Sequence, residues 1–137
     1  MLFSGSHDLI LDFITNKLRE DRAGFDLMIQ PVGSMAGLMA LKRGECHLAG
    51  AHLLDSESGE YNLPFVKRII KDRETTLVNL VYRKQGLFVR KGNPLFIESI
   101  EDLTRDDIVY INRQRGAGTR ILLDYWLEQK SINPADI

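Results

Sequence analysis

The first 52 residues alternate between short apolar runs and segments with helical periodicity. Apolar runs at 2–3, 27–32 and 47–51 are typical of strands. Two segments between them repeat apolar residues every three or four positions, which predicts amphipathic helices. Their predicted apolar faces are Leu9, Ile10, Phe13, Ile14 and Leu18 in the first, and Leu38, Met39 and Leu41 in the second. Strand, helix, strand, helix, strand at these lengths predicts an α/β fold with a parallel sheet and right-handed crossovers.

The ends of these helices carry recognisable signals. Ser6 stands where an N-cap is expected, with Asp8 in the first turn of the first helix, and Lys17 and Arg19 near its end suit the helix dipole. Gly44 is predicted to end the second helix as a C′ glycine.

After residue 52 the pattern is less regular. We expect a loop over 54–61, a short helix over 64–71, a helical turn over 99–103, and a long helix after 120. The apolar positions predicted for that long helix are Ile121, Leu122, Tyr125 and Trp126. Apolar runs at 76–82, 87–90 and 108–111 predict further strands. The first two runs are nearly contiguous, which indicates a chain crossing between two lobes, 1–78 and 79–137.

Composition narrows the classes of function. Hydrophobic residues make up 44% and charged residues 27% of the chain, the net charge is −1 and the pI is about 6.3. We therefore expect no direct binding to nucleic acid or to membranes. No apolar stretch reaches the length of a membrane span or a signal peptide, and one cysteine cannot form an internal disulfide, so a cytoplasmic location is expected. Cys46 and His47 are interpreted as a structural thiol and a surface histidine, and no cofactor or metal is expected.

Three strand-to-helix junctions share a composition of small residues and a hydroxyl. They are Ser4-Gly5-Ser6, Gly33-Ser34-Met35 and Gly116-Ala117-Gly118-Thr119. Each would place free backbone N–H groups and a hydroxyl at the positive end of a helix. In a parallel sheet these junctions lie at the carboxyl ends of the strands, where ligands bind. For any single junction an ordinary N-cap is the favoured interpretation. The three junctions together leave N-cap and anion site as equal alternatives.

The segment from Arg113 to Arg120 carries three arginines and two glycines between a predicted strand and a helix. Glycines allow close approach of the backbone to an anion, and the guanidinium fork fits planar or tetrahedral oxyanions. No Lys-Ser or Lys-Thr pair follows the second glycine, so this segment is not a Walker phosphate-binding loop. Ile121 stands where a dinucleotide-binding fingerprint has its third glycine, so the segment does not match that motif either. The alternative is an exposed basic turn.

His52 and Asp55 follow the third predicted strand and could serve as an acid–base pair. No serine or cysteine lies in a recognisable nucleophile elbow. We therefore interpret His52 as structural or ligand-lining, and the chain as a binding module without catalytic residues. A hydrolase that uses His52 and Asp55 is the less favoured alternative.

A set of motifs across the chain resembles the periplasmic-binding-protein-like domain. In the first half they are Gly33-Ser34-Met35-Ala36-Gly37-Leu38, Leu41-Lys42-Arg43-Gly44-Glu45, Ala49-Gly50-Ala51-His52-Leu53-Leu54-Asp55 and Gly59-Glu60-Tyr61-Asn62. In the second half they are 79–87, Gly92-Asn93-Pro94 and 112–120. Such domains occur in cytoplasmic proteins, fused to MoeA-type molybdopterin-biosynthesis proteins or behind helix-turn-helix DNA-binding domains.

The resemblance implies a type II periplasmic-binding-protein-like fold of two small parallel or mixed-sheet lobes with crossover strands. Related substrate-binding domains hold molybdate or tungstate through serine hydroxyls and backbone N–H groups at helix starts. Carried over, the ligand-binding residues are Ser6, Ser34 and the N–H of Met35 in the first lobe, and Gly118, Thr119 and Arg120 in the second. His52 joins this set as a ligand-lining residue because of its position after the third predicted strand.

Two functions remain open at this point. The leading hypothesis is non-catalytic oxyanion binding, as a molybdate or tungstate sensor or delivery domain in molybdenum cofactor metabolism. The alternative is a co-inducer-binding domain of a transcription factor that senses a small organic metabolite. Related domains continue past Asn133-Pro134, so we expect a truncated second lobe, a fused or associated MoeA-type or DNA-binding partner domain, and a tendency to form homodimers.

Overall fold

The computed structural model describes residues 1–21, 24, 26–114 and 117–137. The chain divides into two compact units, Met1–Leu77 and Val78–Ile137. Each is described by itself below.

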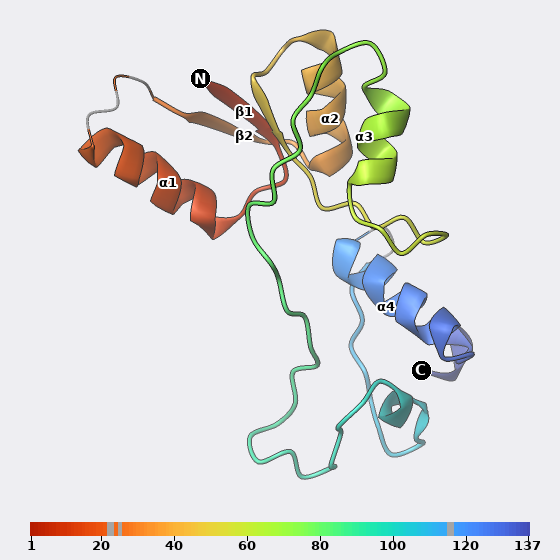
Figure 1. Cartoon of the computed structure of the whole chain (residues 1–137). Coiled ribbons are helices and arrows are strands. Elements are labelled where there is room, and N and C mark those ends of the chain that lie inside the picture. The colour runs from red at the N-terminus through yellow and green to blue at the C-terminus, as the bar shows by residue number, and fades with distance from the viewer. Residues whose placement is uncertain (22–23, 25, 115–116) are drawn as a thin grey trace. The chain divides into compact units, whose positions relative to one another are not determined.

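The first unit is built on a three-stranded parallel sheet (Figure 1). Its elements in chain order are β1 (Leu2–Gly5), α1 (Leu9–Glu20), β2 (Met28–Pro31), α2 (Ser34–Arg43), β3 (Leu48–Gly50) and α3 (Leu63–Ile69). The strand order is β2-β1-β3, and both pairs are parallel. The predicted α/β alternation of the first 52 residues is therefore confirmed.

The strand order places helices on both faces of the sheet. The crossover through α1 leads from β1 outward to β2, and the one through α2 leads back past β1 to β3. Because right-handed crossovers in opposite directions put their helices on opposite faces, α1 and α2 cover different sides. The strand order thus reverses at β1, the arrangement that opens a crevice beside the carboxyl end of a central strand.

The helix α1 buries a narrower stripe than its sequence predicts. Phe3, Leu11 and Leu27 form the buried cluster between α1 and the sheet, and Ile10, Leu18 and Ile29 pack around it. Thr15 is also buried, and its hydroxyl donates to Leu11 O at 2.8 Å. Leu9 and Phe13 are 81% and 63% exposed, so their assignment to the buried face is wrong. A sheet of three short strands can cover only one stripe of a helix.

The helix α2 packs closely against the backbone of β1. A Cβ atom on Gly37 would lie 2.5 Å from Gly5 Cα and 2.6 Å from Ser4 O, so a side chain does not fit there. The same holds for Gly50, where a Cβ would lie 2.8 Å from Ser6 O. Glycine at these contacts lets two backbones approach more closely than any other residue allows.

The ends of α2 are set by glycines. Gly33 is the N-cap residue, and Gly44 adopts a left-handed conformation with φ of 75° at the C-cap. The amide of Gly44 donates to Leu41 O at 3.0 Å, which confirms the predicted helix end. Leu38 is buried as predicted, whereas Met39 is 36% exposed.

Cys46 is buried just before β3, as expected of a structural thiol. Burial raises the pKa of the thiol above its usual value, which disfavours the reactive thiolate. The exposed His47 accepts a hydrogen bond at Nδ1 from Leu2 N at 3.0 Å.

The second unit has a separate core built around α4 (Gly118–Gln129). The buried residues are Leu103, Leu123 and Leu127, and the surrounding ones are Leu87, Ile100, Ile108, Tyr110, Ile132 and Ile137. Leu103 belongs to the 3-10 helix η1 (Glu101–Thr104), and a second 3-10 helix, η2, spans Pro134–Asp136. The predicted apolar face of α4 is wrong, because Leu123 and Leu127 are buried while Trp126 is 48% exposed.

The strands predicted over 76–82, 87–90 and 108–111 are not formed. A strand requires a hydrogen-bonded partner strand as well as a suitable composition. The segment 108–111 nevertheless keeps a two-residue alternation: Ile108 and Tyr110 pack against the core, while Val109 and Ile111 are 91% and 90% exposed. Its sequence pattern therefore predicts which side chains share a face, but not a sheet.

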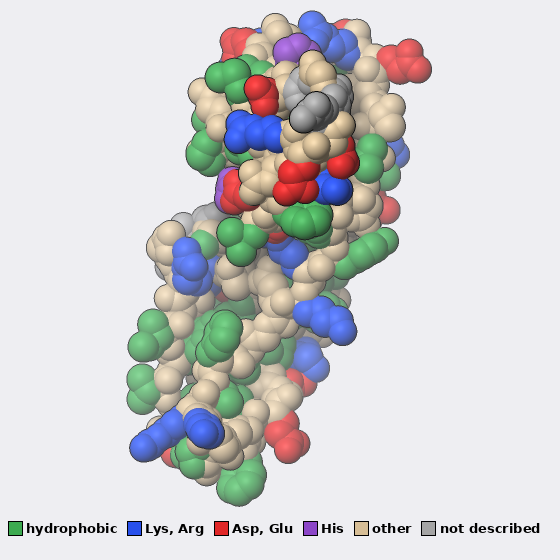
Figure 2. Space-filling model, turned by 90° about the vertical axis from the view of Figure 1, so that its left-hand side faces the viewer, with side chains coloured by type: hydrophobic (Ala, Val, Ile, Leu, Met, Phe, Trp, Pro, Cys, Tyr) green, Lys and Arg blue, Asp and Glu red, His purple; other side chains and the backbone are tan. Residues whose placement is uncertain are grey.

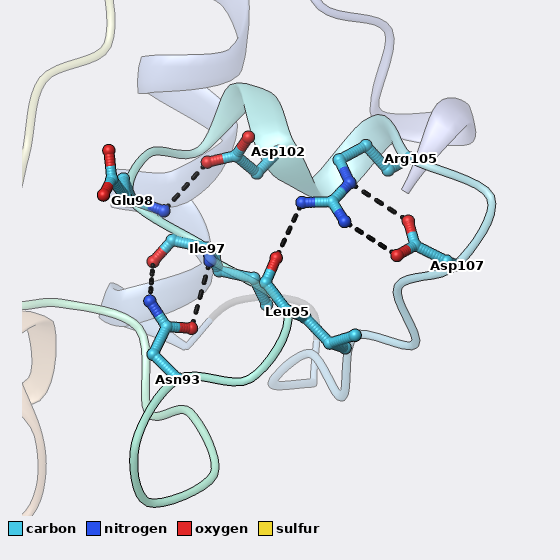
Figure 3. Close-up of polar contacts among 7 residues, drawn as sticks. All are labelled: Asn93, Leu95, Ile97, Glu98, Asp102, Arg105 and Asp107. Carbon is cyan, nitrogen blue, oxygen red and sulfur yellow. Dashed lines mark hydrogen bonds and ion pairs between the residues drawn. The ribbon is translucent and has the colours of Figure 1, made fainter.

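Side chains hold the segment 93–107 together in place of a sheet (Figure 3). The Asn93 amide donates to Ile97 O and accepts from Ile97 N, both at 3.0 Å. Arg105 donates to Leu95 O at 2.8 Å and pairs with Asp107 at 2.7 Å. These bonds fix the loop that leads into the core of the second unit.

We predict that Gly37→Ala destabilises the first unit by about 1–3 kcal/mol, because the new methyl group must push α2 away from β1. Urea unfolding followed by circular dichroism measures the loss. Gly86→Ala is the matched control: nothing lies within 4 Å of its Cβ position, so the change there stays within about 0.5 kcal/mol. Equal effects of the two substitutions would contradict the packing argument.

Candidate functional site

Three polar residues meet at the carboxyl edge of the sheet in the first unit. Ser6 follows β1, Ser34 is the first residue of α2 after β2, and His52 follows β3. They come from chain segments that lie up to 46 residues apart. The structure therefore brings together two of the predicted junctions and the predicted histidine.

One nitrogen atom of His52 is the meeting point of both hydroxyls. His52 Nδ1 lies 2.8 Å from Ser6 Oγ and 3.3 Å from Ser34 Oγ. Ser34 Oγ also accepts a hydrogen bond from the backbone N–H of His52 at 3.1 Å. Ser34 is buried, while Ser6 and His52 are partly exposed. We refer to Ser6, Ser34 and His52 as the Ser–Ser–His cluster.

Backbone hydrogen bonds hold the loops that carry this cluster. Ser6 N donates to Gly50 O at 2.9 Å, which ties the end of β1 to the end of β3. Gly33 N donates to Gly5 O at 3.1 Å, which ties the start of α2 to β1. The positions of the side chains thus follow from the strand order and from the close contact of α2 with β1.

The first turn of α2 contributes backbone donors beside Ser34. The first hydrogen bond of the helix runs from Gly37 N to Gly33 O, so the amides of 34–36 precede the helical ladder. No acidic residue lies in that first turn. Met35 is 45% exposed. The positive end of the helix dipole is therefore not neutralised by a carboxylate from the helix itself.

Ser6 is not the N-cap of α1, contrary to its sequence-based assignment. Asp8 is the N-cap: its carboxylate accepts from Ile10 N at 3.0 Å, and α1 begins at Leu9. Asp8 is the better cap because its carboxylate is charged and sits directly at the helix start. The hydroxyl of Ser6 is instead directed to His52.

The remaining predicted site residues belong to the second unit. Gly118, Thr119 and Arg120 form the first turn of α4, after the N-cap residue Ala117. The Arg120 guanidinium pairs with Asp124 at 2.7 Å, one helical turn later. Upstream, Arg113 is exposed and its Nε donates to Gln114 at 3.3 Å. Arg115 and Gly116 lie outside the described residues.

Asp55 is engaged by groups other than His52. Its carboxylate accepts from Ser58 Oγ at 2.7 Å and from Ser58 N at 3.2 Å, and it lies 3.6 Å from Arg68. The hydrogen bond from the Ser58 hydroxyl lowers the pKa of the Asp55 carboxyl, and the Ser58 amide and Arg68 act in the same direction. Asp55 therefore stabilises the turn over 55–58.

Sequence reasoning missed two positioning residues. Asn62 Oδ1 accepts from Leu53 N at 2.8 Å and so fixes the chain directly after His52. Ser4 is 1% exposed, and its hydroxyl donates to Gln30 Oε1 at 3.1 Å across the β1–β2 pair. The resemblance motifs include Asn62, but nothing in its local sequence indicates this contact.

Beyond the Ser–Ser–His cluster, the surface charges and the possibility of a metal site bear on the function. Acidic and basic side chains are interspersed on the face that Figure 2 shows, in keeping with a net charge of −1. Among the described residues, no group of three or more His, Cys, Asp or Glu side chains is arranged to hold a metal ion. Nor does any helix in that part of the chain have the length and apolar character needed to span a membrane.

We predict that Ser34→Ala destabilises the first unit by about 1–3 kcal/mol, since the backbone N–H of His52 loses its acceptor. Chemical unfolding measures this loss, and Ser56→Ala, at an exposed serine, is the control. A change as small as that of the control would mean that water replaces the Ser34 hydroxyl.

For Asp55 we predict a carboxyl pKa below the usual value of about 3.9. A depressed folded-state pKa contributes stability that is present above the unfolded pKa and is lost as the pH falls through the folded one. An NMR titration of the side-chain carboxyl measures it, and Ser58→Ala should move the value upward. An unchanged pKa in that variant would assign the shift to Arg68 instead.

Comparison with known proteins places the chain in a family. Residues 15–137 match the family model described as the PBP superfamily domain. The chain is also similar to the uncharacterized protein YvgK of Bacillus subtilis (strain 168), with 47% identity over 105 residues. That match covers 77% of this chain and 34% of YvgK, so the chain spans about a third of that relative's length. No solved structure matches.

The family match covers both units and agrees with the α/β architecture of the first. Since it extends over most of the chain, it confirms the resemblance seen in the sequence motifs. The chain belongs to the periplasmic-binding-protein-like (PBP) superfamily.

Proposed function

We propose that this domain binds a small oxyanion of the molybdate or tungstate kind at the Ser–Ser–His cluster, without catalysing a reaction. The observation that carries the proposal is the convergence of Ser6 Oγ and Ser34 Oγ on one atom, His52 Nδ1. Membership of the PBP superfamily suggests ligand binding in general. The choice of an oxyanion comes from the chemistry of the cluster.

The cluster has more hydrogen-bond donors than its internal contacts can use. An imidazole Nδ1 carries either one proton or one lone pair, so it makes one strong hydrogen bond at a time. Two hydroxyls compete for it, which leaves at least one hydroxyl proton available for a ligand. The amides at the start of α2 add further donors and a favourable dipole. A group rich in acceptor oxygens and negative charge satisfies all of these donors.

A binding role fits the cluster better than a hydrolytic one. In a hydrolase the histidine would be oriented by a carboxylate, and Asp55 is the candidate that the sequence offers. Its carboxylate is instead held by Ser58 and Arg68. In the proposed binding role, the two serine hydroxyls therefore act as hydrogen-bond donors to a ligand and not as nucleophiles.

The proposal extends to the second unit and to a biological role. Within the second unit, we propose Gly118, Thr119 and Arg120, in the first turn of α4, as further anion-binding residues. The Arg120 guanidinium would then interact with both the anion and the Asp124 carboxylate. The role proposed is that of a sensor or delivery domain in molybdenum cofactor metabolism.

Calorimetric titration with molybdate, tungstate, sulfate and phosphate tests the proposal. We expect heat from at least one tetrahedral oxyanion, and weaker binding in Ser6→Ala and Ser34→Ala. Losing a hydrogen bond to a charged group costs about 1.5–3 kcal/mol, or roughly tenfold to a hundredfold in Kd. Ser56→Ala, at an exposed serine away from the cluster, should bind like the unmodified chain. Absence of heat from all four anions would refute the proposal.

A further inference from the structure

We infer that His52 couples anion binding at this site to the uptake of one proton. The inference deepens the proposed function and rests on it. It starts from the shared position of His52 Nδ1, at 2.8 Å from Ser6 Oγ and 3.3 Å from Ser34 Oγ.

The protonation state of Nδ1 decides how many hydroxyl protons face a ligand. When Nδ1 carries a lone pair, one serine hydroxyl donates to it, and one hydroxyl proton is left for the anion. When Nδ1 carries a proton, it donates to a serine oxygen, and both hydroxyl protons are free. A bound oxyanion therefore favours the protonated nitrogen.

The charge of the imidazolium acts in the same direction. A neutral histidine can place its proton on Nδ1, but only the imidazolium adds a positive charge beside the anion. The hydroxyl protons and this charge make the doubly protonated ring the form that binds an anion best. The proton comes from solvent and is held on the ring, so no other group changes its protonation state.

The charged groups on the adjoining segments are few. Ser6 is followed by His7, which lies 3.4 Å from Asp12, and by Asp8, which caps α1. The start of α2, residues 34–38, is uncharged. The segment after His52 carries Asp55, which is bonded to Ser58 and lies near Arg68. Of these groups, His7 carries a second imidazole close in sequence to Ser6 and needs its own control.

The experiment is a calorimetric titration with sulfate, which stays a dianion across the range, at intervals from pH 6 to 8.5. For the unmodified chain we expect a Kd that increases with pH, with a slope approaching about tenfold per pH unit for one coupled proton. The titration is then repeated in buffers of different ionisation enthalpy, because the observed heat depends on how many protons the protein takes from the buffer. We expect the protein to take up nearly one proton per bound anion at pH values above the pKa of the free His52 ring.

His52→Gln is the decisive variant. Glutamine keeps a polar side chain that can donate, and the variant retains the backbone N–H that bonds Ser34. We expect it to bind sulfate with a Kd that no longer changes with pH. The chain has three histidines, so His7→Gln and His47→Gln are matched controls that should keep the slope.

An NMR titration of the His52 ring with and without sulfate gives an independent measurement. We expect the apparent pKa of the His52 ring to increase when sulfate is present. If this pKa does not increase, the inference is overturned, even if His52→Gln fails to bind sulfate. A pH-independent Kd in the unmodified chain, or the same slope in His52→Gln, also overturns it and leaves the proposed anion site standing. No binding by the unmodified chain at any pH overturns both.

Discussion

The contact between α2 and the central strand is the constraint on which the first unit depends. Gly37 allows the helix backbone to lie against Ser4 and Gly5, and Gly50 allows β3 to lie against Phe3 and the Ser6 loop. A methyl group at either position would overlap atoms of the neighbouring segment. This contact places the start of α2 beside the ends of β1 and β3, and so brings Ser34 to His52.

Hydrophobic periodicity and helix-end signals were sufficient to predict the elements of the first 52 residues, because these elements are local and regular. The parallel sheet, both crossover helices and the end of α2 at Gly44 could all be predicted from the sequence. Periodicity did not predict which residues of α1 are buried. The width of the buried stripe depends on the number of strands in the sheet that covers the helix. Leu11 and Thr15 are buried there, while Phe13 faces solvent.

The second unit shows the limit of the same reasoning. An apolar run such as 108–111 is suited to a strand, but the hydrogen bonds of a sheet depend on a partner segment that composition does not specify. The polar contacts of 93–107 are likewise formed by single side chains, such as Asn93 with Ile97, and leave no periodic signal. For the candidate site, the sequence indicated Ser6, Ser34 and His52 but not their shared nitrogen atom, which only the folded chain defines.

The loops at the sheet edge are held mainly by their own backbones, through the bonds from Ser6 N to Gly50 O and from Gly33 N to Gly5 O. The scaffold and the side chains of the proposed anion site are therefore largely separate parts of the first unit. Exchanging the side chains at positions 6 and 52 would leave those two main-chain bonds available. Substitutions of these side chains could therefore change the chemistry of the sheet edge without rebuilding the backbone that presents it.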